Sequence, residues 1–158
     1  MGGYAVSLQQ EPIVRQQMLI RRPAAEVCEA FVDPSVTTKF WFTKSSGRLE
    51  PGKTVTWSWD MYGVSAPVRV LDLVDGRRIL VEWGDPATTV EWAFDDRGDS
   101  TLVVVVNSGF QGSDDDKVAR ALDSAGGFSF VLAALKAWLE HGIQLNIVAD
   151  HHPDGHVA

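Results

Sequence analysis

Hydrophobic and polar residues alternate through most of the first two thirds of the chain, and this period of two predicts β-strands. The clearest strand begins at Lys53. Its hydrophobic face consists of Val55, Trp57, Trp59 and Met61. Similar runs predict further strands over residues 11–21, 64–74, 78–83, 88–94 and 101–110. Short turns separate these runs, so the pattern indicates six or seven antiparallel strands.

The run 64–74 contains two irregularities. Leu71 and Leu73 fall out of phase with the hydrophobic positions before them, which predicts a β-bulge or strong curl. Pro67 cannot donate a backbone hydrogen bond and therefore favours an edge position. Asp75-Gly76 follows directly and is typical of a type I′ hairpin turn, in which both central residues have positive φ.

Two short helices are expected between the first strand and the others. The first begins near Pro23 and places Ala24, Val27, Cys28 and Phe31 on one side. The second begins with Asp33 as N-cap and Pro34 at the first helical position. It leads into the aromatic run 40–42, which is Phe-Trp-Phe.

The last third of the chain predicts one long helix, from Ser113 to His141. Ser113 and Asp116 have the spacing of a capping box, and the helix dipole favours the acidic run 114–116 there. An apolar stripe recurs at helical spacing and comprises Phe128, Leu132, Leu135, Leu139 and Ile143. Gly126-Gly127 predicts a kink or a close contact in the middle of the helix. Residues 143–149 are expected to continue helically.

Together these elements predict a single α+β domain over residues 1–150, followed by a polar tail over 151–158. A helix with a long apolar stripe has to pack on an apolar surface, and the strands supply one. We therefore expect a curved antiparallel sheet wrapped around the C-terminal helix, with space for a ligand between them.

Three segments carry a resemblance to a known group of proteins. They are residues 20–27 (IRRPAAEV), residues 31–34 (FVDP) with the aromatic run 40–42, and Gly127-Phe128 with the leucines that follow it in the last helix. The order of elements and these segments resemble the START-like superfamily, which has the helix-grip fold of Bet v 1-type proteins. The segments are similar to its branch related to the activator of Hsp90 ATPase. The likeness covers about residues 13–149 and departs at Phe128, where a tryptophan often follows the glycine.

The resemblance implies a cavity between the sheet and the last helix that binds a small hydrophobic molecule of lipid, polyketide or aromatic type. The candidate ligand-binding residues are Phe40, Trp41, Trp57, Trp59, Met61, Trp83, Trp92, Phe94, Phe128 and Leu132. In the alternative interpretation, these side chains fill the core themselves. The resemblance also leaves open a co-chaperone-like interaction module, a cyclase or hydrolase acting on an aromatic or polyketide substrate, and a homodimer.

The composition of the chain argues against some classes of binding partner. The formal net charge is −7 and the pI is about 4.9, which argues against nucleic acid because phosphates require clustered Lys and Arg. No run reaches the length of about 20 apolar residues that a membrane span needs. The first ten residues lack the pattern of a secretory leader. One cysteine excludes an internal disulfide, and we expect a cytoplasmic protein.

Other motifs predict no catalytic residue, metal site or cofactor. We interpret Arg97-Gly98-Asp99 as a hairpin turn, and the histidines at 151, 152 and 156 as part of the polar tail. Cys28 lies on the apolar face of its helix and reads as a buried thiol. No nucleophile elbow or dinucleotide fingerprint is present. The carboxylates that an enzyme of this fold would need inside the cavity are predicted to face solvent: Asp60, Glu82 and Glu91.

Overall fold

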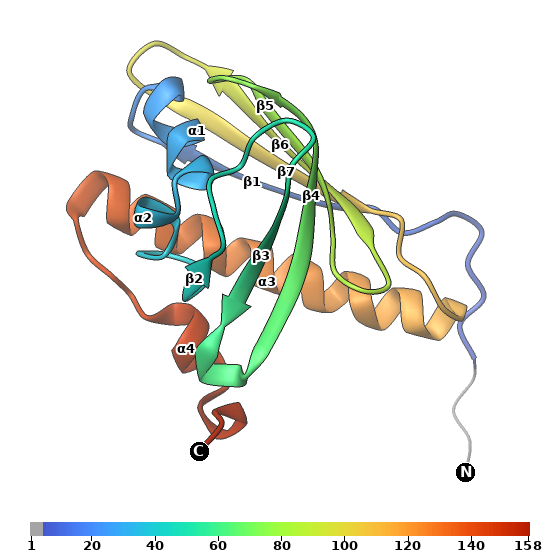
Figure 1. Cartoon of the computed structure of the whole chain (residues 1–158). Coiled ribbons are helices and arrows are strands. Elements are labelled where there is room, and N and C mark those ends of the chain that lie inside the picture. Colours follow the sequence, from blue (N-terminus) through green and yellow to red (C-terminus); the bar gives the residue numbers. More distant parts are fainter. Residues whose placement is uncertain (1–4) are drawn as a thin grey trace.

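The computed structural model describes residues 5–158, and a seven-stranded antiparallel sheet forms its largest part (Figure 1). The strand order is β1-β7-β6-β5-β4-β3-β2, so consecutive strands are neighbours except where β1 joins β7. The strands are β1 (Val14–Ile20), β2 (Lys44–Ser45), β3 (Thr54–Trp59), β4 (Val64–Val74), β5 (Arg78–Trp83), β6 (Thr88–Asp96) and β7 (Thr101–Ser108). Residues 1–4, part of the stretch judged to lack a leader pattern, lie outside the described residues.

The helices lie on one side of this curved sheet. The long helix α3 crosses the open side, and α1 and α2 lie at the end where α3 finishes (Figure 1). Their bounds are α1 (Ala24–Val32), α2 (Pro34–Thr37), α3 (Asp114–His141) and α4 (Ile147–His151), with short 3-10 helices η1 (Asp60–Tyr62) and η2 (Pro153–Gly155). The predicted fold class, an antiparallel sheet gripping a C-terminal helix after two short helices, is confirmed.

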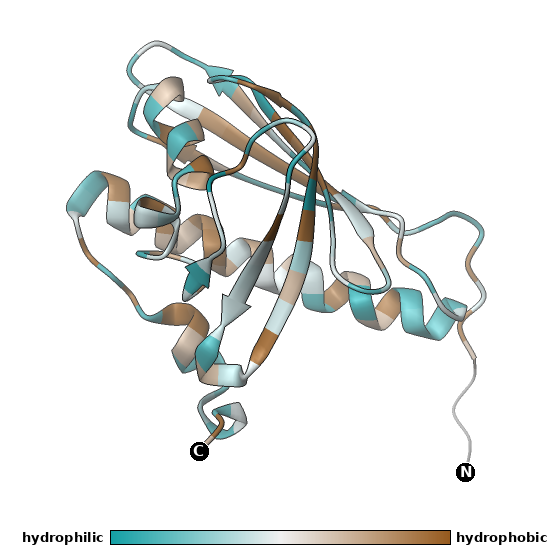
Figure 2. Cartoon of the chain, viewed as in Figure 1, coloured by the Kyte–Doolittle hydropathy of each residue, from teal (hydrophilic) through white to brown (hydrophobic). Residues whose placement is uncertain are grey.

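The core lies between the sheet and the second half of α3. Figure 2 shows apolar residues gathered on the strands and on this part of α3, whereas the beginning of α3 is mainly hydrophilic. The buried residues of α3 all come after its midpoint and are Phe128, Val131, Leu132, Ala134 and Leu135. The first half of α3 therefore leaves the inner face of the sheet less covered.

Two local predictions for β4 and its turn need correction. The bulge is confirmed between Val70 and Asp72, but β4 lies between β3 and β5 and is not an edge strand. Pro67 is tolerated because β5 ends at Trp83, opposite Val68, so only β3 runs beside the proline. In the following turn only Gly76 has a positive φ, of 72°, so the turn is not type I′.

The predicted start of α3 is confirmed. Ser113 accepts a hydrogen bond from the backbone N–H of Asp116 at 3.1 Å, and Asp116 accepts one from the N–H of Ser113 at 3.1 Å. The helix ends at His141, because Gly142 adopts a left-handed conformation with φ of 65°. Ile143, predicted to extend the apolar stripe, therefore lies outside the helix and is 53% exposed.

The glycine pair does not interrupt α3, which runs as one continuous helix through both residues. A close contact with a strand, one of the predicted reasons for the pair, is wrong, because a Cβ at Gly126 or Gly127 would meet no atom of another element within 4 Å. Both positions thus border open space.

The C-terminal segment folds back onto η1. After a loop, where helical continuation was predicted, α4 occupies residues 147–151, and η2 follows within the predicted tail. The Tyr62 hydroxyl donates to the carbonyl oxygen of Val148, and the N–H of Val157 donates to the carbonyl of Met61 at 2.9 Å. Met61 thus belongs to η1 and not to β3, as the alternation had predicted.

By length and composition alone, α3 could cross a membrane. Its apolar side chains from Phe128 to Leu135, however, belong to the hydrophobic core of the domain. We therefore assign α3 to the core of the helix-grip fold.

A polar cluster fastens the end of α3 to the end of β1. Lys136 Nζ donates to the carbonyl of Leu19 at 2.8 Å and to Glu140 at 2.6 Å, and Glu140 also accepts the backbone N–H of Arg21 at 3.0 Å. Burial acts to raise the pKa of Glu140, but the hydrogen bonds from Lys136 and Arg21 outweigh it and hold the pKa below its usual value. The charged carboxylate therefore stabilises the folded state.

We predict that Glu140→Gln lowers the free energy of unfolding at pH 7 by about 1 kcal/mol, because charge-assisted hydrogen bonds are lost. Because the pKa of Glu140 is lower in the folded state, its contribution to stability is fully present when the pH is above the unfolded-state pKa of about 4.3. This contribution is lost as the pH falls through the folded-state pKa. Urea unfolding between pH 7 and 3 should thus show a shallower pH dependence in the variant. Glu50→Gln, at an exposed ion pair with Lys53, is the matched control and should change little. Equal losses in the two variants would contradict the anchoring role.

Candidate functional site

A cavity of about 430 Å³ lies between the sheet and the middle of α3. Its walls come from the end of β5 and the turn after it, from β6 and β7, from α3 between Arg120 and Val131, and from η1 and the C-terminal segment. This volume is within the range of about 300–1,000 Å³ that is usual for small-molecule sites. The cavity exists because the first half of α3 carries small or polar residues on the side facing the sheet.

Three aromatic side chains form the apolar wall. The ring centroids of Trp41 and Trp83 lie 5.7 Å apart, and Phe128 lies 5.9 Å from Trp41 and 6.0 Å from Trp83. The rings meet edge-on or tilted, arrangements that stabilise aromatic pairs. Phe128 and Trp41 are nearly buried, at 3% and 7% exposure, so the wall is backed by tightly packed core.

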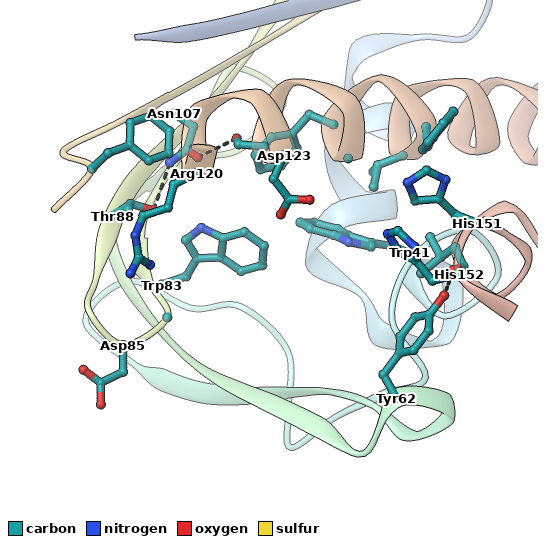
Figure 3. A pocket seen from close by; sticks show the side chains of 18 of the residues that line it. Trp41, Tyr62, Trp83, Asp85, Thr88, Asn107, Arg120, Asp123, His151 and His152 are labelled. Carbon is teal, nitrogen blue, oxygen red and sulfur yellow. Dashed lines mark hydrogen bonds between the residues drawn. The ribbon is translucent and has the colours of Figure 1, made fainter. Parts of the chain in front are cut away.

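A buried amide holds the polar end of the cavity together. Asn107 on β7 is 2% exposed and donates to Thr88 Oγ1 at 3.0 Å and to the carbonyl of Thr89 at 2.8 Å. Its side-chain oxygen accepts from Ser124 Oγ at 2.7 Å. The network ties α3 to two strands and satisfies the amide, whose burial without partners would be costly (Figure 3).

Three charged residues also line the cavity: Asp85, Arg120 and Asp123. Figure 3 shows the carboxylate of Asp123 directed from α3 towards Trp83 and Trp41. Arg120, one turn earlier on α3, extends instead past Thr88 towards the side where Asp85 lies. All three residues are exposed, so these charges lie on the open side of the cavity, with the carboxylate of Asp123 nearer to the aromatic wall than the guanidinium of Arg120.

The opposite end is built by residues far apart in the sequence. Tyr62 of η1, Phe130 of α3, and His151 and His152 of the C-terminal segment line it. The rings of Phe130 and His151 are 4.6 Å apart, and those of the two histidines are 4.1 Å apart. The C-terminal segment is thus part of the cavity wall.

A second hollow, of about 210 Å³, lies beside the first. Phe40, Trp41 and Met61 contribute to it, together with the loop before α4. Trp41 and Val148 border both spaces, so these two side chains form the partition between them.

The sequence-predicted ligand residues fall into groups. Trp41, Trp83 and Phe128 line the main cavity, and Phe40, Trp41 and Met61 line the smaller hollow. Trp59 packs against Trp41 and Trp83 and is partly buried. The remaining four are core residues with at most 4% exposure: Trp57, Trp92, Phe94 and Leu132. They lie behind the wall and do not border the cavity. The sequence does not separate these two positions, because alternation predicts which face a side chain takes but not how deeply neighbours cover it.

Sequence reasoning missed the polar lining. Asn107 occupies an inward position of β7, two residues after the buried Val105, and a polar residue in that phase signals a satisfied buried group. Asp123 and Gly127 are four residues apart and so share a helical face, which could have placed the carboxylate at the glycine gap. No pattern in the sequence links Tyr62 to residues 148–152, because only the folded chain brings them together.

The carboxylates expected to face solvent do so and are paired there. Glu82 lies 3.3 Å from Arg69, and Glu91 lies 2.6 Å from Arg78. These ion pairs bridge neighbouring strands on the face of the sheet away from α3. Cys28 is 2% exposed, and burial raises the pKa of its thiol. Within residues 5–158 no group of three or more metal-ligating side chains comes together.

Comparison with known families identifies the family of this chain. A family model described as activator of Hsp90 ATPase homolog 1-like protein matches residues 21–140. The chain belongs to this family. The resemblance seen in residues 20–27 and in the last helix is thereby confirmed, as is the helix-grip fold. Among curated proteins no match was found.

Solved structures share the fold over most of the chain. Protein SSP2350 from Staphylococcus saprophyticus is 30% identical, with a TM-score of 0.75, and the match covers 85% of this chain and 96% of that one. DynU16, a protein in the dynemicin biosynthetic locus, is 22% identical with a TM-score of 0.72, covering 84% of this chain and 48% of its own. The Aha1 dimer from Colwellia psychrerythraea is 16% identical with a TM-score of 0.72, covering 83% and 98%.

We predict that Asn107→Ala destabilises the protein by about 2 kcal/mol, because it removes the bonds to Thr88, Thr89 and Ser124 in a buried setting. Ser124→Ala removes only the link to α3 and should cost about 1 kcal/mol. Urea unfolding of both variants measures the difference. Equal losses would show that the strand-to-strand part of the network contributes nothing.

Proposed function

We propose that this protein binds a small, largely apolar molecule in the cavity between the sheet and α3, without transforming it. The observation that carries the proposal is a cavity of about 430 Å³ with an aromatic wall of Trp41, Trp83 and Phe128. Apolar walls with a few placed polar groups are how small-molecule sites are usually built. Membership of a helix-grip family supports the same location for a ligand.

The glycine pair in α3 supports the proposal, because it leaves the ligand space free of side chains. Each glycine inside a helix costs about 1 kcal/mol relative to alanine. A Cβ at Gly127 would meet no neighbouring atom, so packing does not require the glycine. Gly127 borders the cavity, however, and any larger side chain there would occupy ligand space. The absence of a side chain at Gly127 therefore enlarges the cavity and does not stabilise the fold.

The polar groups support binding rather than turnover. Ser124, a hydroxyl on the cavity wall, donates its proton to Asn107 and has no general base as acceptor. Thr88 Oγ1 accepts from the same amide. The network thus fixes positions and leaves no activated nucleophile among these groups. We place this function in a reducing cytoplasm, which suits the single thiol of Cys28.

The aromatic wall favours flat, aromatic or polyketide-like ligands, because tryptophan and phenylalanine rings offer planar faces and edges for stacking. DynU16, which shares the fold, is a protein in the dynemicin biosynthetic locus. The family description favours a second role, as a protein-interaction module related to the activator of Hsp90 ATPase. That role would use the outer surface and would not depend on the cavity.

We predict that Gly127→Leu fills the cavity and weakens binding of a cavity ligand by about tenfold or more, because its side chain takes the place of ligand atoms. Gly126→Leu is the matched control: this neighbour also borders open space but does not line the cavity. Both variants should keep or raise the melting temperature, since leucine is the better helix former.

The measurement combines native mass spectrometry of freshly purified protein with tryptophan fluorescence titrations of fatty acids, flavonoids and polyketides. A molecule retained by the wild type and by Gly126→Leu, but lost from Gly127→Leu, supports the cavity. An empty protein whose fluorescence no compound changes would overturn the proposal. Binding of a purified Hsp90-type chaperone by all three proteins would then favour the interaction module.

A further inference from the structure

The charge inside the cavity distinguishes classes of ligand. Asp123 lies one helical turn before Gly127, so its side chain emerges beside the gap that the glycine leaves. Figure 3 shows its carboxylate directed from α3 towards Trp83 and Trp41, with no hydrogen bond to the other lining residues drawn, and the residue is exposed. This is the position that a bound molecule would occupy.

An unpaired carboxylate in this place contrasts with the rest of the sheet. On the outer face Glu82 and Glu91 are each held by an arginine across the strands. At the end of α3 Glu140 is held by Lys136. Asp123 faces aromatic rings instead of such a cation. Asp123 is exposed, so a ligand that covers its carboxylate would displace water from it, and a positive group brought there would gain from meeting it.

Arg120 does not neutralise this carboxylate. Although it is three residues from Asp123, its guanidinium extends towards Thr88 and the rim (Figure 3). Asp116 lies one turn before it on α3, and Asp85 lies on the same side of the cavity. Arg120 thus extends away from Asp123, and the carboxylate of Asp123 remains the charge nearest to the aromatic wall in this view. The other titratable groups of the lining, Tyr62, His151 and His152, stand at the opposite end.

The aromatic wall adds a second attraction for cations. Tryptophan binds a cation over its ring face more strongly than the other aromatic side chains do. Trp41 and Trp83 lie on either side of the Asp123 carboxylate in Figure 3. These two rings touch each other edge-on, so an ammonium group would lie against the cavity side of the pair and meet ring electrons and the carboxylate together. The net charge of −7 acts in the same direction at longer range.

We propose that the cavity selects a cationic ligand, an aromatic or short aliphatic amine whose ammonium group is held by Asp123 against the wall of Trp41 and Trp83. This inference rests on the proposed function, because it assigns a charge to the ligand of that same cavity. The apolar body of the ligand lies along Phe128, beside the space left open at Gly127.

The test uses three probes with the same ring system and different charge: 1-naphthalenemethylamine, 1-naphthalenemethanol and 1-naphthoate. Titrations are followed by ¹H–¹⁵N chemical shifts at pH 8, where histidine is ordinarily neutral and an alkylamine is still protonated. We expect the amine to bind about tenfold more tightly than the alcohol, and the carboxylate most weakly. Asp123→Asn should cut the affinity for the amine about tenfold and change that for the alcohol less than about twofold.

Asp150→Asn is the matched control, because it removes the same charge from the nearby helix α4 at a position that does not line the cavity. It should leave all three affinities within about twofold of the wild type. Tighter binding of naphthoate, strengthened further by Asp123→Asn, would overturn the inference and assign the dominant charge to Arg120.

The outcomes separate this inference from the proposed function. If all three probes bind equally well and Gly127→Leu abolishes their binding, the cavity binds ligands but charge selection is wrong. If none of the probes shifts a cavity resonance, charge selection is again wrong. In that case an empty protein with no fluorescence response to the wider panel would overturn the proposed function as well.

Discussion

The packing of Trp41 is the contact on which the rest of this structure depends. Its ring lies within 6.4 Å, centroid to centroid, of aromatic rings from α1, β3, β5, β6 and α3. The residue itself follows α2, so one side chain joins the short helices, the sheet and the long helix. Because Trp41 also borders both hollows, the side chain that closes the core is the one that bounds the cavity. A substitution that changes the packing of Trp41 therefore changes both the core and the shape of the cavity.

An open cavity beside such a core requires the helix to stay at a fixed distance from the sheet. Three sets of hydrogen bonds hold α3 there. Lys136 and Glu140 bind the C-terminal end of β1, Gln16 donates to the carbonyl of Ala125 at 3.2 Å, and Ser124 donates to Asn107. These contacts lie along α3 from Ser124 to Glu140 and resist its collapse onto the strands. The small residues between them can then leave space that a looser helix would fill.

The fold followed from the sequence because local rules and hydrophobic periodicity agree over most of the chain. The capping box at Ser113, the N-cap at Asp33 and the bulge in β4 each depend on residues close in sequence, and each lies where predicted. Pro67 was misplaced because the length of the neighbouring strand decides whether a proline fits, and that length is a tertiary property. Ile143 was misplaced because the conformation of Gly142 stops the helix before the apolar stripe does.

The cavity lining was only partly predictable, for a related reason. Alternation identified the inner face of each strand and so found Trp83, but it could not separate Trp57 and Trp92, which neighbouring rings cover, from residues that border open space. The contribution of Tyr62 and of the segment after α3 depends on the hydrogen bond from the Tyr62 hydroxyl to the carbonyl of Val148 and on the backbone bond from Val157 to Met61. Such contacts leave no periodic signal, since the segment is short and mostly exposed.

Where local rules are broken, the exceptions gather at one place. A helix interior normally excludes glycine, a strand interior favours apolar residues, and a carboxylate normally finds a partner or solvent. Gly127 and Asn107 depart from the first two preferences and line the same cavity, whereas Asp123, which also lines it, is exposed to solvent. Trp92, whose buried indole N–H finds no acceptor among the described residues, lies directly behind the wall, 6.2 Å from Phe128. A sequence optimised only for stability would replace Gly127 and Asn107, so their convergence is the strongest physical argument that this space serves a function.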